Sequence, residues 1–238
     1  MERSILFIER IFRRMKVLEL FAGSRSFSKV AEEMGMETHT TDYKDFEGID
    51  QVCDIFDFDY DKVGFVPDII WASPPCRTFS IASCSTHWTK DKIAINIFNQ
   101  SYKDKEFIPK TENAEWGLRM VRKMKEIIAH YTELNNDLYF IIENPRGLLR
   151  KMTEMKIYNL ERKTIWYCQY GDTRAKPTDI WTNAPWIPRP VCKNGNPDCH
   201  HERAPRGSKT GTQGLKGNYE RSIVPEQLCR EILESIIK

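Results

Sequence analysis

Short apolar runs that end abruptly in small or polar residues constrain the fold more than any other feature of the sequence. The runs at 16–21, 68–71 and 138–142 each have the length of a buried strand. Segments with helical periodicity, at 27–34 and 113–134, lie between them. Strand and helix thus alternate along the chain. This order predicts an α/β fold with a mostly parallel sheet and helices on both of its faces.

Weaker patterns predict the remaining elements. We expect a second strand at 37–41, short strands at 165–170 and 179–181, and a closing helix at 225–237. The segment 81–109 has no clear periodicity and is too long for an ordinary connection, so we expect a functional loop there.

Composition excludes several classes of protein. The 238 residues suit one domain, and 36 Lys and Arg against 34 Asp and Glu leave a net charge of +2. This balance excludes a polybasic coat or an acidic tail, and restricts any nucleic-acid contact to a local basic patch. No run approaches 18 apolar residues, so we expect no membrane span. Seven irregularly spaced cysteines without an export signal indicate free thiols in the cytoplasm.

Polar and reactive residues gather where the predicted strands end. In parallel sheets, ligands bind at the carboxyl ends of the strands. The turn Glu19–Ser24 has small residues at its tip, which lets the backbone approach a cofactor. Asp42 could accept two ribose hydroxyls, Tyr43 could stack on a base, and Asp54 could accept from an adenine amino group. A helix cap or a turn is the alternative role for each aspartate.

Cys76 and Glu143 are the sharpest candidates for chemistry. Pro74 and Pro75 fix the backbone that leaves a buried strand, and Cys76 stands at the tip of this turn. That position favours a nucleophile over a buried hydrophobe. Glu143 ends another apolar strand, where an unpaired carboxylate is costly. It is either a paired structural glutamate or a carboxyl group that shares a proton with a ring nitrogen.

Four motifs together resemble, in the right order, those of the C5-cytosine DNA methyltransferases. They are VLELFAGSRSFS at 17–28, SPPCRTFS at 73–80, ENP at 143–145 and GNYERSIVPEQL at 217–228. The chain resembles the short, often phage-encoded branch of that family over nearly all of 15–238. The most specific part is the pairing of the Pro-Cys turn with Glu-Asn some seventy residues later.

The resemblance implies a reaction and roles for residues. S-adenosylmethionine would be the cofactor, and the target would be a cytosine flipped out of DNA, in a bacterial or phage-infected cell. Cys76 would be the nucleophile, Glu143 would bind cytosine N3, and Lys176 or Arg174 would contact cytosine O2. The implied cofactor-binding residues are Phe21, Gly23, Ser24, Asp42, Tyr43, Asp54 and Pro74. The loop 81–109 would close over the flipped base.

The family's pattern also suggests a division of the chain. We expect an N-terminal helical extension at 1–14, a catalytic methyltransferase domain at 15–182, a short basic target-recognition segment at 183–216, and a closing motif with its helix at 217–238. The third part is much smaller than the family's usual recognition domain. It can contact few base edges, so we expect a short target sequence or a protein partner that supplies specificity.

Two questions stay open at this point. Cys192, Cys199, His200 and His201 could hold zinc, with Cys168 as a further ligand, but their spacing is unusual and we assign no metal site. Other functions also compete: an amino methyltransferase acting on cytosine N4 or adenine N6, an RNA methyltransferase, or a relative that binds without turnover. Cys76 together with Glu143 favours cytosine C5, because neither residue is needed for the amino reaction or for binding alone.

Overall fold

A seven-stranded sheet forms the centre of the molecule. The computed structural model describes residues 14–238 except 91–106, 157–159, 161, 194 and 203–216. The strands lie in the order β3-β2-β1-β4-β7-β9-β8, and β9 alone runs antiparallel to its neighbours. Their bounds are β1 Lys16–Leu20, β2 Glu37–Asp42, β3 Gln51–Val52, β4 Ile69–Ala72, β7 Tyr139–Pro145, β8 Arg162–Trp166 and β9 Pro177–Thr182. The predicted mostly parallel sheet is confirmed.

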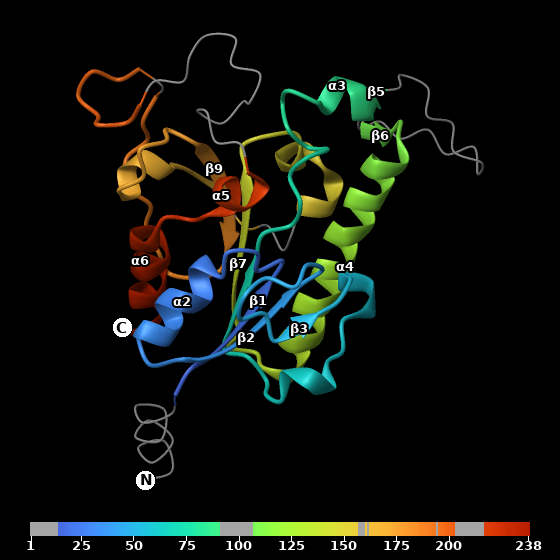
Figure 1. Ribbon diagram of the computed structural model, residues 1–238, viewed down its shortest axis with the longest axis vertical. Helices are drawn as coiled ribbons and strands as arrows, with labels where there is room; N and C mark the ends of the chain where they lie inside the picture. Colours follow the sequence, from blue (N-terminus) through green and yellow to red (C-terminus); the bar gives the residue numbers. More distant parts are fainter. Residues whose placement is uncertain (1–13, 91–106, 157–159, 161, 194, 203–216) are drawn as a thin grey trace.

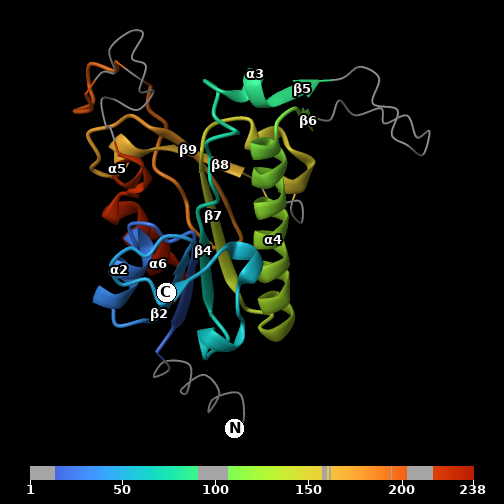
Figure 2. The same ribbon diagram turned by 45° about the vertical axis from the view of Figure 1, so that its right-hand side comes forward.

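Helices cover both faces of the sheet, as the sequence predicts. Helices α2 (Ser26–Glu33) and α6 (Glu226–Ile237) pack together on one face, and the long α4 (Glu112–Leu134) covers the other (Figures 1 and 2). Side chains alternate along each buried strand. In β1, Val17 faces the core beneath α2 and α6, and Leu18 faces the core beneath α4. This alternation places Glu19 and Glu143 on the α2/α6 side.

The predicted strand at 165–170 is wrong in its second half. Strand β8 ends at Trp166, and the 3₁₀ helix η5 (Tyr167–Tyr170) follows it. The last pair of the β8–β9 ladder is Trp166 with Pro177, so the chain has no partner strand beyond that point and turns back through Gly171 at φ 85°. The other 3₁₀ helices are η1 Ile55–Asp57, η2 Asp61–Val63, η3 Leu149–Lys151 and η4 Thr153–Met155.

The segment 81–109 contains regular secondary structure where the structure describes it. It holds the short helix α3 (Cys84–His87) and the antiparallel pair β5 (Trp88–Lys90) and β6 (Phe107–Pro109), while 91–106 lies outside the described residues. The Trp88 indole donates to the Thr78 carbonyl at 2.9 Å and stacks on Phe79. This segment is therefore anchored directly to the turn that carries Cys76.

Three other predictions from the sequence concern the two ends of the chain and a membrane span. The helix expected at 1–14 lies outside the described residues except for Arg14, which donates to the carbonyls of Gly35 and Met36. The closing helix forms close to its expected bounds as α6, and a further short helix, α5 (Asn218–Ser222), precedes it. No helix in the described part of the chain is both long enough and apolar enough to cross a bilayer.

Candidate active site

The turn that carries Cys76 is held against the end of β7 by two hydrogen bonds and one close van der Waals contact. The Asn144 side-chain amide donates to the Pro74 carbonyl at 2.8 Å, and the Leu148 amide donates to the Phe79 carbonyl at 2.7 Å. A Cβ at Gly147 would lie 2.4 Å from the same Phe79 carbonyl oxygen, so only glycine fits there. These contacts join β4 and β7 at their carboxyl ends, which sets Cys76 beside Glu143.

Cys76, Glu143, Tyr167 and Lys176 form one cluster at this edge, which we call the catalytic-edge cluster. Glu143 is 5% exposed, and the Tyr167 hydroxyl donates to its Oε1 at 2.8 Å. Lys176 Nζ lies 3.9 Å from the same oxygen and 4.5 Å from the centre of the Tyr167 ring. Lys176 also donates to the carbonyl of Arg221, a residue of α5, at 3.2 Å. The buried carboxyl group thus has both a hydroxyl and a cation beside it.

The electrostatics of Cys76 link it to the rest of this cluster. The residue is exposed, yet the surrounding protein removes enough water from the thiol to raise the pKa of Cys76. The Lys176 charge lowers that pKa and the Glu143 carboxylate raises it. Neutralising Glu143 would therefore favour the Cys76 thiolate. The sequence predicts a chemical role for both residues, but it does not show that the charge of Glu143 acts on the Cys76 thiol.

At the other end of the same edge, the first turn surrounds the Asp42 carboxylate. The Gly23 amide donates to Asp42 Oδ2 and the Lys44 amide to Oδ1, both at 3.0 Å. These two bonds orient the group and leave lone pairs for two hydroxyl donors. Gly23 has φ 49°, and a Cβ there would lie 3.5 Å from Ser222 Oγ. Desolvation raises the pKa of Asp42. The narrow cradle and the oriented carboxylate fit the ribose of the implied cofactor.

The other predicted cofactor residues have more varied surroundings. Phe21 begins the turn at φ 57° and packs partly against the core, and the buried Ser24 contacts the Ser26 hydroxyl at 2.7 Å. Tyr43 is 66% exposed, beside Asp42. Asp54 caps η1 by accepting from the Phe56 amide at 3.2 Å, which is the structural role that the sequence left open for it. Pro74 is buried under the Cys76 turn.

Some assignments from the sequence change in the structure. Arg174, one of two candidates for an O2 contact, is 7% exposed, pairs with Asp172 and donates to the carbonyls of Glu220 and Ile223. These bonds commit it to holding α5, which leaves Lys176 as the cation beside Glu143. The sequence did not predict that Tyr167 belongs to the site, because the strand expected at 165–170 does not show which face of the sheet its residues occupy.

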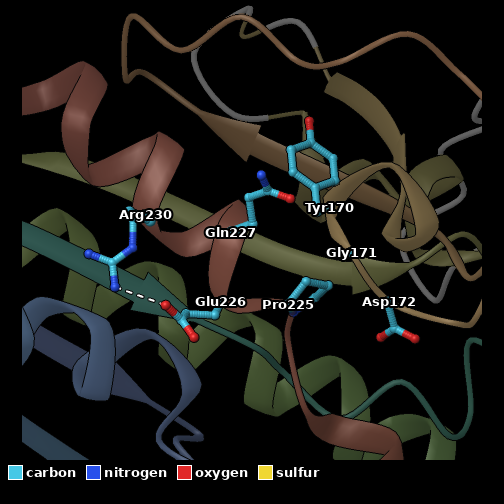
Figure 3. Close-up of a pocket in the computed structure, with 7 residues that line it drawn as sticks. All are labelled: Tyr170, Gly171, Asp172, Pro225, Glu226, Gln227 and Arg230. Carbon is cyan, nitrogen blue, oxygen red and sulfur yellow. Dashed lines mark hydrogen bonds and ion pairs between the residues drawn. The ribbon is translucent and has the colours of Figure 1, made fainter.

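A pocket of about 490 Å³ lies apart from the catalytic-edge cluster, between the end of η5 and the start of α6 (Figure 3). Tyr170, Gly171 and Asp172 line one side of it, and the first residues of α6 line the other. None of the predicted catalytic or cofactor-binding residues lines this pocket. The candidate site is therefore defined by side-chain chemistry at the strand ends and not by this pocket.

The strand order, the two helical layers and the polar carboxyl edge define a Rossmann-like, S-adenosylmethionine-dependent methyltransferase fold. A Frog virus 3 (isolate Goorha) protein named "Probable DNA (cytosine-5)-methyltransferase" is 29% identical to this chain over 237 residues, covering 92% of this chain and 99% of the viral one. The resemblance to the C5-cytosine DNA methyltransferases is thus confirmed over nearly the full length of both chains. No protein-family model matches the chain.

Two solved structures are also similar. The Entamoeba histolytica methyltransferase EhMeth is 12% identical with a TM-score of 0.46, and the match covers 71% of this chain and 52% of that one. A mutant of DNMT2 from Spodoptera frugiperda is 16% identical with a TM-score of 0.40, and the match covers 80% of this chain and 57% of that one. This chain therefore spans slightly more than half of each.

Proposed function

We propose that this protein transfers a methyl group from S-adenosylmethionine to C5 of cytosine in DNA, through a covalent bond between Cys76 and cytosine C6. The observation that carries the proposal is the convergence of Cys76, Glu143 and Lys176 at the carboxyl edge of the sheet. A binding protein needs neither a thiol nor a buried carboxyl group at this position. An amino methyltransferase has no use for either.

Each residue of the catalytic-edge cluster has a task in this reaction. The Cys76 thiolate adds to C6, which makes C5 electron-rich enough to be methylated. Glu143 holds a proton at cytosine N3 while charge builds there, and takes it back afterwards. A base then removes the C5 proton, and the Cys76 sulfur leaves C6. The cofactor supplies only the electrophilic methyl group.

The two proton positions are coupled. With Cys76 as a thiol and Glu143 as a carboxylate, the cluster already contains the one proton that the reaction requires. When that proton moves to the hydrogen bond between Glu143 and cytosine N3, the Glu143 charge no longer adds to the effect of burial in raising the pKa of Cys76. The Lys176 charge continues to stabilise the thiolate. Nucleophile and acid thus form in the same event. Tyr167 orients Glu143 through its 2.8 Å hydrogen bond.

The cofactor would lie along the first half of the edge. Asp42 would accept from its ribose hydroxyls, and the Gly23 turn would approach it closely, with Ser222 closing the cradle. Phe21, Ser24, Tyr43 and Pro74 would complete the pocket. Asp54 caps η1 with one carboxylate oxygen, and its other oxygen would accept from the adenine amino group.

The proposal for the target rests on the segment 183–216. Its basic residues Arg203, Arg206, Lys209 and Lys216 lie outside the described residues, and we propose that they contact phosphates. So small a segment favours a short recognition sequence or a protein partner. All seven cysteines are free, which suits a reaction that needs a reduced thiol, as in the cytoplasm.

The direct test uses S-adenosylmethionine labelled with tritium in its methyl group, with duplex DNA and with RNA in parallel. We expect label in 5-methyldeoxycytidine after digestion of the DNA, with none from Cys76→Ser and normal transfer by Cys84→Ser. Label on an exocyclic amino group, or in RNA alone, would contradict the proposal. A protein that binds S-adenosylmethionine but labels nothing would be a binding relative.

A further inference from the structure

Three thiols and one imidazole converge at a second place, away from the catalytic-edge cluster. Donor atoms of Cys168, Cys192, Cys199 and His201 all lie within 4.8 Å of one another. We call these four residues the thiol cluster. Cys168 belongs to η5, whereas the other three come from the segment that follows β9. The chain therefore brings together residues up to 33 positions apart in sequence to form it.

The spacing of the donors fits a single tetrahedral ion. Zinc–sulfur bonds of about 2.3 Å place neighbouring ligand atoms roughly 3.6–3.8 Å apart in a tetrahedron. His201 Nδ1 lies 3.8 Å from Cys192 Sγ, and the Gly195 amide donates to Nε2 at 2.9 Å. Nδ1 thus faces the sulfurs. A metal at Nδ1 leaves the proton on Nε2, so we expect the Gly195 hydrogen bond to open on binding.

The groups around the sulfurs distinguish a ligand set from ordinary packing. Buried cysteines often act only as small hydrophobes. Here, amide donors point at all three sulfurs: Gln169 at Cys168 (3.9 Å) and Cys199 (3.8 Å), and Asn196 at Cys192 (3.8 Å). Such outer donors support thiolate ligands. His201 is 8% exposed, so its imidazole is buried together with the sulfurs.

The residues at the start of the surrounding segment are held by the buried Trp186 and by Arg189, which pairs with Glu231, but the part that carries the three ligands has little regular structure. Within 183–193 and 195–202, an isolated bridge between Glu202 and Arg174 is the sole regular pairing, and there is no helix. Segments too small for a hydrophobic core are commonly stabilised by a metal or by disulfides. The four ligands would join this segment to η5, whose first residue, Tyr167, contacts Glu143.

We propose that Cys168, Cys192, Cys199 and His201 bind one structural zinc ion. The set uses all four positions of a tetrahedron, which leaves none for a catalytic water. Thiolate-rich tetrahedral sites select zinc over harder divalent ions. The ion would fix residues 192–201 of the 183–216 segment to η5. This inference does not depend on the proposed methyl transfer, since a structural ion would serve any function of the fold.

The test measures metal content in the full-length protein, purified under reducing conditions and without added metal. We expect about one zinc per chain by mass spectrometry of the metals. His201→Asn should lose most of this zinc, and His201→Cys should retain it, because sulfur replaces nitrogen in the same tetrahedron. The neighbouring His200→Asn is the matched control and should keep the metal, because His200 is exposed and contacts the Asp172 carbonyl.

A second measurement does not depend on how any variant folds. Cobalt(II) exchanged into the wild-type protein should show the intense visible bands of a tetrahedral site and the charge-transfer band of thiolate ligation. Wild-type protein without zinc that also fails to take up cobalt would overturn the proposal. Zinc retained by His201→Asn, iron in place of zinc, or a disulfide among the three cysteines in the reduced protein would overturn it as well.

Discussion

Glu19 in β1 and Glu143 in β7 are two buried carboxyl groups on the same face of the sheet. They are 2% and 5% exposed, and both lie near Cys229 of α6, whose pKa is raised by burial first and then by the charges of the two glutamates. Glu19 accepts the amides of Phe27 and Ser28, the second at 2.8 Å, and so caps the start of α2. Glu143 accepts from Tyr167 and lies near Lys176. The two carboxyl groups are thus buried to a similar extent but have different hydrogen-bonding and charged partners.

The difference explains why one glutamate holds the fold and the other suits chemistry. Glu19 interacts mainly with backbone amides, and burial raises its pKa from 4.5 to about 7. Glu143 lies near a cation and a thiol, and its charge is one of the causes that raise the pKa of Cys76, after burial. A helix cap needs only acceptors, whereas proton transfer to a substrate needs a group coupled to a nucleophile.

The largest effect should come from Glu143→Gln. We expect turnover to fall about 100- to 10,000-fold, because an amide cannot supply the proton at cytosine N3. The same change removes a charge that raises the pKa of Cys76, so Cys76 should be alkylated faster by iodoacetamide at neutral pH. Slower alkylation would contradict the predicted effect of the Glu143 charge on Cys76, and near-normal turnover would contradict the role of Glu143 in catalysis. Glu19→Gln is the matched control for replacing a buried glutamate on this face.

Glu19→Gln should alter stability and its pH dependence. The raised pKa means that folded Glu19 binds its proton more tightly than the unfolded chain does. Its contribution to stability is therefore complete below about pH 4.5 and is lost as the pH rises through about 7. Relative to the variant, the wild-type free energy of unfolding should fall by roughly 3 kcal/mol over that range. Urea unfolding at a series of pH values measures this, with Glu37→Gln as an exposed control; parallel curves would contradict it.

Asp42→Ala tests the third carboxyl group of this edge. Loss of an oriented acceptor for two hydroxyls should weaken S-adenosylmethionine binding about 10- to 100-fold. Calorimetry measures this directly, and Asp45→Ala, an exposed neighbour, should bind normally. Unchanged affinity in Asp42→Ala would place the cofactor elsewhere.

The smallest effect concerns Lys176. Its charge lowers the pKa of Cys76, so Lys176→Gln should raise that pKa and slow alkylation of Cys76 about 3- to 10-fold at neutral pH. The direction is opposite to that expected for Glu143→Gln. The exposed Lys29→Gln serves as control. An unchanged rate in Lys176→Gln would show that burial alone governs the thiol, and a faster rate would contradict the assigned direction of the Lys176 effect.

The sequence predicts the positions of strands much better than the partners of side chains. Apolar runs and their polar ends located β1, β4 and β7, because burial on both faces leaves a clear pattern. Tyr167 could not be found this way, because it follows the point where β8 loses its partner strand. Contacts such as Tyr167 with Glu143 depend on three-dimensional register, which no local pattern records.

The central claim is that Cys76 attacks cytosine C6 with Glu143 beside it. DNA that contains 5-fluorocytosine tests it most directly, because the fluorine at C5 cannot leave as a proton does. With S-adenosylmethionine present, the wild-type protein should form a covalent adduct with this DNA that survives denaturation, and mass mapping of peptides should place the bond on Cys76. An adduct on another cysteine, or none from a protein that methylates ordinary DNA, would contradict the account.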